Sequence, residues 1–171
     1  MVGFKTFFKV TLFALLALSL WNGKVFAEPP KGYKFGGYDD AIQRAKKSGK
    51  KIFLYYGRHG CGFCDMTNKK SFSKTSVRLR YQKHYELVYV DAEGGERMTL
   101  VSGERITEQQ FGAKQKVLGT PYFLFLEPDG TPIYKAPGFK TEQDLIMLDD
   151  FVYKNHYKTK SYNEFSKEHA S

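Results

Sequence analysis

The feature that most constrains the fold of this chain is a pair of cysteines placed directly after a short apolar segment. Residues 51–56 read Lys-Ile-Phe-Leu-Tyr-Tyr, a pattern typical of a strand buried on both faces. Residues 57–60 break the segment, and Cys61-Gly62-Phe63-Cys64 then opens a helix-like stretch. The sequence therefore predicts a strand that passes through a tight loop into a helix, with both cysteines in the first helical turn.

The segments around this motif predict an α/β fold. The helix-like stretch reaches about residue 84, with an interruption near Ser73, and a second buried strand follows at 87–90. Strand, helix and strand at this spacing favour a parallel crossover. Residues 122–126 and 132–134 form two further strands, and the short turn between them predicts an antiparallel hairpin.

Helix signals mark the remaining elements. Asp39 is placed to cap a helix over 39–48, and Gly49 is placed to end it. Thr107 to Gln110 and Thr141 to Asp144 have the pattern of capping boxes, each starting a helix. We expect residues 92–106 to be an irregular insertion. The tail after Lys154 is polar, and three aromatic residues are available to dock it: Tyr157, Tyr162 and Phe165.

Composition and charge limit the class of protein. The chain has 171 residues, of which 42% are apolar and 26% charged, and this suits one folded domain. The formal net charge is +9, but residues 1–27 hold three basic and no acidic residues, which leaves 24 basic and 18 acidic residues in the rest. These basic residues are scattered and never form a run longer than two, so nucleic-acid binding is not expected.

The first 27 residues have the order of a secretory signal peptide. Lys5 and Lys9 precede an apolar stretch at 10–21, and Val25 and Ala27 are suitably small for a cleavage site. The alternative is an uncleaved anchor, but twelve apolar residues fall short of the roughly 20 that span a bilayer. We expect cleavage after Ala27, a domain at 28–171 and a periplasmic location.

The cysteine motif predicts redox chemistry. A cysteine at a helix N-terminus lies beside unpaired backbone N–H groups, which stabilise its thiolate, and in CxxC motifs its pKa falls to roughly 3.5–7.5. A second thiol, separated from the first by two residues, can attack a mixed disulfide and release the substrate. Three alternatives are a structural disulfide, covalent haem attachment and a zinc site. Residue 65 is Asp where haem attachment needs His, and the four histidines lack ligand spacing, so no metal or other cofactor is predicted.

These features together resemble the thioredoxin superfamily. A CxxC motif at a helix start and Gly119-Thr120-Pro121 before a hairpin are its marks, and the turn at 127–130 with Pro137-Gly138-Phe139 fits that hairpin. The chain looks most like the SoxW-type exported thioredoxins, which share the insertion and a tail rich in tyrosine and lysine. The resemblance covers about residues 38–166 and implies a thioredoxin fold with a mixed sheet of four to five strands.

The resemblance also implies roles for individual residues. Cys61 attacks, Cys64 resolves, and Pro121 is cis and packs over the disulfide. The backbone of Thr120 would pair with an extended substrate segment, with Gly62 and Phe63 beside it. The implied activity is reduction of disulfides in other exported proteins by a monomer supplied with electrons by a membrane thiol carrier. A disulfide oxidant or isomerase and a redox-inactive peptide-binding module are the alternatives.

The chain departs from ordinary thioredoxins at two positions. Tyr55 stands where they have a buried carboxylate, and Gly60 where they have tryptophan. Tyr55 is most simply a core side chain, so the proton acceptor for Cys64 is unassigned. Asp65 is read as a first-turn charge, and His59 either as an exposed loop residue or as a partner of the thiolate.

Overall fold

The structure is a computed structural model and describes residues 29–169. The predicted signal peptide at 1–27 lies outside the described residues. Within residues 29–169, no helix is both long enough and apolar enough to cross a membrane.

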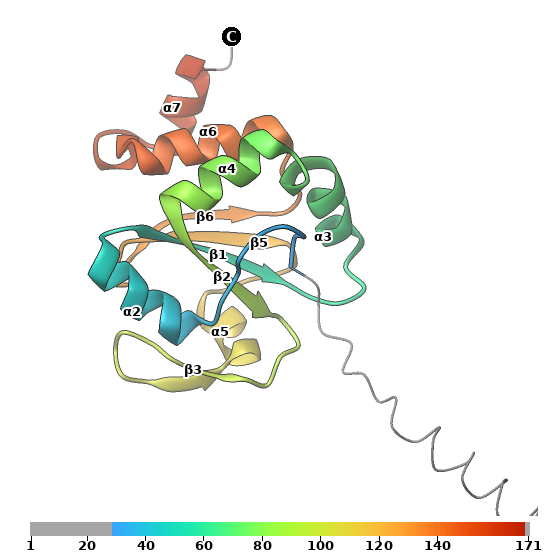
Figure 1. Cartoon of the computed structure of the whole chain (residues 1–171), viewed down its shortest axis with the longest axis vertical. Coiled ribbons are helices and arrows are strands. Elements are labelled where there is room, and N and C mark those ends of the chain that lie inside the picture. The colour runs from blue at the N-terminus through green and yellow to red at the C-terminus, as the bar shows by residue number, and fades with distance from the viewer. Residues whose placement is uncertain (1–28, 170–171) are drawn as a thin grey trace, which may run out of the picture.

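A four-stranded mixed sheet forms the centre of the described part of the chain (Figure 1). Its strand order is β2-β1-β5-β6. β1 pairs with β2 in parallel and with β5 antiparallel, and β5 pairs with β6 antiparallel, which confirms the predicted crossover and hairpin. The strands run over Lys51–Gly57 (β1), Tyr85–Asp91 (β2), Tyr122–Leu126 (β5) and Pro132–Pro137 (β6).

Helices cover both faces of this sheet (Figure 1). α3, α4 and α6 lie on one face, and α2 and α5 lie on the other together with β3. The helices have these bounds: α2 Tyr38–Ser48, α3 Gly62–Thr67, the π-helical turn η2 Asn68–Phe72, α4 Thr75–His84, α5 Glu108–Lys114, α6 Glu142–Tyr153, the 3₁₀ turn η3 His156–Lys158 and α7 Tyr162–His169. The predicted interruption near Ser73 is confirmed, because η2 ends at Phe72 and α4 begins at Thr75.

Two hydrophobic cores result, one on each face. Side chains alternate along β1, so Phe53 and Tyr55 enter the core under α3, α4 and α6, whereas Leu54 and Tyr56 enter the core that α2 and α5 cover. All four are buried. The reading of this segment as a strand buried on both faces is therefore confirmed, and the first core also holds Cys61 and Cys64.

The prediction of an irregular insertion at 92–106 is wrong in part, because two short strands interrupt the irregular backbone. The segment forms a small antiparallel sheet of β3 (Arg97–Thr99) and β4 (Arg105–Thr107). Met98 and Ile106 face each other in this sheet and are both buried in the second core. Thr107 ends β4 and also caps α5 through the predicted capping box with Gln110.

Two further segments, α2 and the tail after Lys154, can be compared with the sequence-based expectations. Asp39 does not cap α2, because the helix begins one residue earlier with Gly37 at the cap, and the Asp39 carboxylate instead accepts a hydrogen bond from the Thr99 N–H at 2.7 Å. Gly49 does end the helix, in the left-handed conformation with φ of 72°. The tail forms η3 and α7, and Phe165 of α7 is buried in the first core.

Candidate active site

The two cysteines lie at the start of α3, and the loop at 58–60 connects this helix to β1. They form a disulfide bond, and both are nearly buried. Cys61 is the N-cap residue of α3, and its Sγ accepts a hydrogen bond from the Cys64 backbone N–H at 3.1 Å. After reduction the same N–H can stabilise a thiolate on Cys61, because hydrogen bonds to a charged sulfur favour the charged form.

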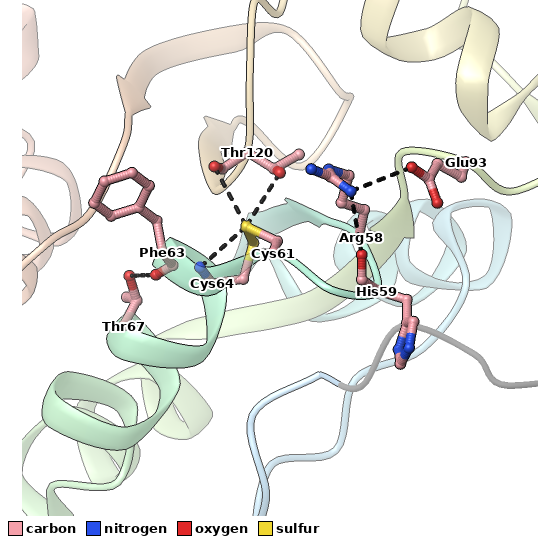
Figure 2. The surroundings of a disulfide bond; sticks show 8 residues. All are labelled: Arg58, His59, Cys61, Phe63, Cys64, Thr67, Glu93 and Thr120. Atoms are coloured by element: carbon pink, nitrogen blue, oxygen red, sulfur yellow. Dashed lines mark hydrogen bonds and ion pairs between the residues drawn. A yellow bond between two sulfur atoms is a disulfide. The ribbon is translucent and has the colours of Figure 1, made fainter.

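The loop that contains Thr120 and Pro121 lies against Cys61 (Figure 2). β1 and β5 are neighbours in the sheet, so the loop before β5 meets the loop after β1. The peptide bond between Thr120 and Pro121 is cis. The Thr120 hydroxyl donates a hydrogen bond to Cys61 Sγ at 3.2 Å, and the Thr120 carbonyl oxygen lies 3.4 Å from the same sulfur. Thr120 is thus the second group positioned to act on Cys61.

Two exposed apolar side chains belong to the segments that carry the disulfide and Thr120. Phe63, between the cysteines, is 62% exposed, and Leu118, two residues before Thr120, is fully exposed. Gly62 is exposed as well. Sequence reasoning selected Phe63 and missed Leu118, although a lone leucine in a loop directly before Gly-Thr-Pro is a usable signal of a contact surface.

Tyr55 is a core residue, as predicted. Its ring is fully buried. It stacks on Phe72, with ring centroids 5.6 Å apart, and packs in a tilted arrangement against Phe123, with centroids 4.9 Å apart. Among the described residues its hydroxyl has no hydrogen-bond partner. Burial raises the pKa of Tyr55 far above its ordinary value, and the nearby Tyr89 and Asp65 raise it further. The hydroxyl is therefore neutral near pH 7 and does not act as a base in the way a carboxylate would.

The charged residues beside the motif have other contacts. Arg58 pairs with Glu93 at 3.4 Å, and Asp65 pairs with Lys69 at 3.5 Å on the exposed side of the helix. Figure 2 shows the His59 ring pointing away from the disulfide. The geometry therefore supports the readings of Asp65 as a first-turn charge and of His59 as an exposed loop residue. Within residues 29–169, no group of three or more His, Cys, Asp or Glu side chains is arranged to hold a metal ion.

Residues 38–152, more than half of the chain, match the family described as "Thioredoxin-like domain". The chain belongs to the thioredoxin-like family. The expected thioredoxin fold is thereby confirmed, with four strands in the central sheet. The match includes both cysteines, Thr120 and Pro121.

Solved structures share the thioredoxin-like fold at low sequence identity. A thioredoxin-fold protein from Helicobacter pylori is 19% identical with a TM-score of 0.60, and the match covers 70% of this chain and 80% of that one. A thioredoxin from Thermus thermophilus is 19% identical with a TM-score of 0.58, covering 70% and 85%. A putative disulphide-isomerase from Bacteroides thetaiotaomicron is 21% identical with a TM-score of 0.56, covering 70% and 91%. No curated protein sequence matches the chain.

The site can exchange disulfides. A CxxC disulfide in a thioredoxin-like fold supports thiol–disulfide oxidoreductase chemistry in general, and the surroundings of Cys61 suit a nucleophilic thiolate. Cys64 lies in the first turn of α3, where it can attack a mixed disulfide on Cys61.

Proposed function

We propose that the protein is an exported, periplasmic disulfide reductase that acts on disulfides in other exported proteins. The observation that carries the proposal is the contact of Cys61 Sγ with two hydrogen-bond donors, the Cys64 N–H and the Thr120 hydroxyl. Both donors stabilise Cys61 as a thiolate, so Cys61 is the sulfur that attacks the substrate. Cys61 is also the better leaving group when a thiolate breaks the Cys61–Cys64 disulfide, because a stabilised thiolate leaves faster.

The reaction follows from this assignment. The Cys61 thiolate attacks a substrate disulfide, forms a mixed disulfide and releases one substrate thiolate. The Cys64 thiol loses its proton and attacks Cys61 Sγ, which releases the second substrate thiolate and restores the Cys61–Cys64 disulfide. An extended substrate segment pairs with the backbone of Thr120 and contacts Phe63, Gly62 and the cis Pro121 beside it.

The electrons come from a membrane thiol carrier, which reduces the Cys61–Cys64 pair after each turnover. We place the chain with the SoxW-type exported thioredoxins. The insertion at 92–106 and the tail after Lys154 support this placement. The protein is proposed to act as a monomer without a metal or other cofactor, since the reactive disulfide is sufficient for the exchange.

The experiment that tests the function uses two cysteine variants. The wild-type protein should reduce insulin with dithiothreitol as electron donor, and Cys61→Ser should not. Cys64→Ser should accumulate a mixed disulfide through Cys61 that is visible on a non-reducing gel. Reduction of insulin by Cys61→Ser at the wild-type rate would refute the assigned mechanism.

The direction of electron flow is tested by the equilibrium reduction potential of the Cys61–Cys64 pair. A reductase should have a potential near the thioredoxin value of about −270 mV. A value near about −120 mV, as in strong oxidants, would instead make the protein a disulfide donor.

A further inference from the structure

The first described segment, residues 29–37, packs as a strap against η2 and α4. The Tyr33 hydroxyl donates a hydrogen bond to the last carbonyl of η2 at 2.9 Å. The Gln82 side chain of α4 donates to the Gly32 carbonyl at 2.8 Å, and the Arg78 side chain lies directly beside Gly32. The strap, η2 and α4 therefore form one continuous surface.

This surface is basic because the segments that form it have no acidic residues. Residues 29–38 contain two lysines, residues 66–85 contain six Lys or Arg residues, and neither range contains Asp or Glu. Folding thus brings together cations that are scattered in the sequence. Six of them have no ion-pair partner within residues 29–169. We call these six the basic surface: Lys31, Lys34, Lys70, Lys74 and Lys83, which are exposed, and Arg78, which is half-buried.

Carboxylates that lie beside η2 and α4 do not neutralise this surface. Most of them already pair with cations outside the six, and Glu142, beside Ser76, offsets one of the six charges. The paired carboxylates are Asp65 with Lys69, and Asp149 and Asp150 with Arg80. The basic surface therefore keeps a net positive charge and suits an anionic partner.

An exposed apolar side chain lies among these cations. Leu79 is 61% exposed and follows Arg78 in α4. Lys83 lies one turn further on and on the same face of the helix as Leu79, because residues four apart in a helix are neighbours. A leucine beside cations suits a membrane interface, where the apolar side chain enters the boundary of the acyl chains and the cations stay with the headgroups.

Two observations place the basic surface near a bilayer. Lys31 lines a cleft together with Gly60 and Asp65, so the surface extends to the loop before the disulfide. Only residues 22–28 separate the apolar stretch of the predicted leader from the strap. Before cleavage, the start of the strap is therefore held within about 30 Å of that stretch, the greatest length that such a short segment can span.

We propose that the basic surface docks the protein on membranes that contain anionic phospholipids, with the lysines and Arg78 contacting headgroup phosphates. The inference rests on the proposed export and membrane electron donor. It adds the surface by which the protein reaches the bilayer where that donor lies. Each Lys or Arg near an anionic membrane strengthens binding about fivefold, and salt weakens the attraction.

The test measures binding of the exported protein to sedimented vesicles at low salt, after its intact mass has defined the N-terminus. One set contains about two parts phosphatidylcholine to one part phosphatidylglycerol, and the other contains phosphatidylcholine alone. We expect binding to the anionic vesicles only, and release at about 1 M salt, where the Debye length falls to about 3 Å. Equal binding to both sets would overturn the inference. So would no binding to either, which would leave an acidic protein as the partner.

Variants separate the basic surface from the general charge of the protein. Lys34→Gln combined with Lys74→Gln should weaken binding about 25-fold, at about fivefold for each lysine. Lys46→Gln combined with Lys47→Gln makes the same change in charge at the end of α2, on the other face of the sheet (Figure 1), and should weaken it less than about threefold. Equal losses in the two variants would contradict docking through this surface.

Leu79→Gln tests whether the partner is a bilayer, because it removes an apolar side chain without changing the charge. Binding to the anionic vesicles should weaken about fivefold. Unchanged binding would show that Leu79 does not enter the membrane and would overturn its place in the docking surface.

The outcome is distinguishable from failure of the proposed function, since vesicle binding needs no thiol. Cys61→Ser should bind the anionic vesicles as the wild type does. If the wild type reduces insulin but does not bind vesicles, the docking surface is wrongly assigned. If it binds vesicles but reduces no insulin with dithiothreitol, the redox function itself fails.

Discussion

The side-chain hydroxyl of Thr120 links the loop before β5 to Cys61 Sγ. Thr120→Val keeps the branched shape and removes the hydrogen bond to Cys61 Sγ. A hydrogen bond to a charged group contributes about 1.5 kcal/mol or more, and 1.36 kcal/mol corresponds to one pH unit. We expect the thiolate absorbance of the reduced variant to titrate about one pH unit higher than in the wild type. An unchanged midpoint would show that the hydroxyl does not act on the thiolate, and Thr120→Ser is the matched control that keeps the donor.

Tyr55 stands where ordinary thioredoxins have a buried carboxylate, and its neutral hydroxyl cannot accept a proton as a carboxylate does. The buried hydroxyl has no partner among the described residues, and an unsatisfied polar group of this kind destabilises the fold. Tyr55→Phe should therefore raise the free energy of unfolding by about 1 kcal/mol, measured in urea, because it removes an unsatisfied buried hydroxyl. Insulin reduction should stay within twofold of the wild type. A tenfold slower reaction at pH 7 would instead place the hydroxyl in the transfer of the Cys64 proton.

At the scale of elements, one buried carboxylate joins α6 to two residues of α4. Asp149 of α6 is fully buried and pairs with Arg80 at 3.0 Å and with His84 at 2.8 Å, both from α4. Arg80 also pairs with the partly exposed Asp150 at 2.9 Å. Removing one partner of a buried pair leaves the other charge unsatisfied.

Substituting each of the two aspartates should show how much the buried and the exposed ion pair each contribute to the free energy of unfolding. Asp149→Ala is expected to lower the free energy of unfolding by about 3 kcal/mol, near the lower end of the range for breaking buried pairs, because Arg80 keeps Asp150. Asp150→Ala should cost about 1 kcal/mol or less, as surface pairs do. Urea unfolding of the oxidised proteins measures both. Equal losses for the two variants would contradict a special role for the buried carboxylate.

Glu108, at the start of α5 and directly after β4, makes the stability of the fold depend on pH. Its pKa is raised, chiefly by burial and further by the neighbouring Glu96 and Asp91, although the Asp91 N–H donates to it. A raised carboxyl pKa means that the folded state disfavours the ionised form. The resulting destabilisation appears as the pH rises from the unfolded pKa to the folded one, is complete above the folded value, and vanishes below about pH 4, where the carboxyl is protonated in both states.

Glu108→Gln keeps an oxygen that can accept from the Asp91 N–H and removes the charge. The variant should therefore unfold at a higher urea concentration than the wild type at pH 7, and the difference should shrink as the pH falls toward 4. Glu104→Gln, at an exposed position in the insertion, is the control, and it loses only the exposed ion pair with Lys114. A difference that grows on acidification would show the opposite sign of linkage.

For the whole molecule, the end of the chain contributes to the core on the active-site face. Phe165 of α7 is buried and packs on Phe151 of α6, with ring centroids 5.4 Å apart. Phe165→Ala should lower the free energy of unfolding by about 3–4 kcal/mol, as for other buried phenylalanines. Lys167→Ala, on the exposed side of α7, should change it by less than about 0.5 kcal/mol. A small loss in the phenylalanine variant, seen by thermal or urea unfolding, would mean that the tail does not dock.

The sequence alone predicts the parts of this molecule whose signals are local. The apolar runs at β1 and β5, the capping boxes of α5 and α6, and Gly49 at the end of α2 are each determined by neighbouring residues, and the structure confirms them. β3 and β4 were missed because three residues each are too short to show alternation, and their pairing depends on contacts with α2.

The two edges of the central sheet differ in how they are closed to further strands. Beside β2, Gly36 forms a parallel bridge with Val88, donates its N–H to the Leu87 carbonyl and accepts from the Tyr89 N–H. At the other edge, β6 begins and ends with proline, which has no N–H to donate. The proposed function brings this protein into contact with other exported chains. These protected edges limit cross-strand pairing with such chains.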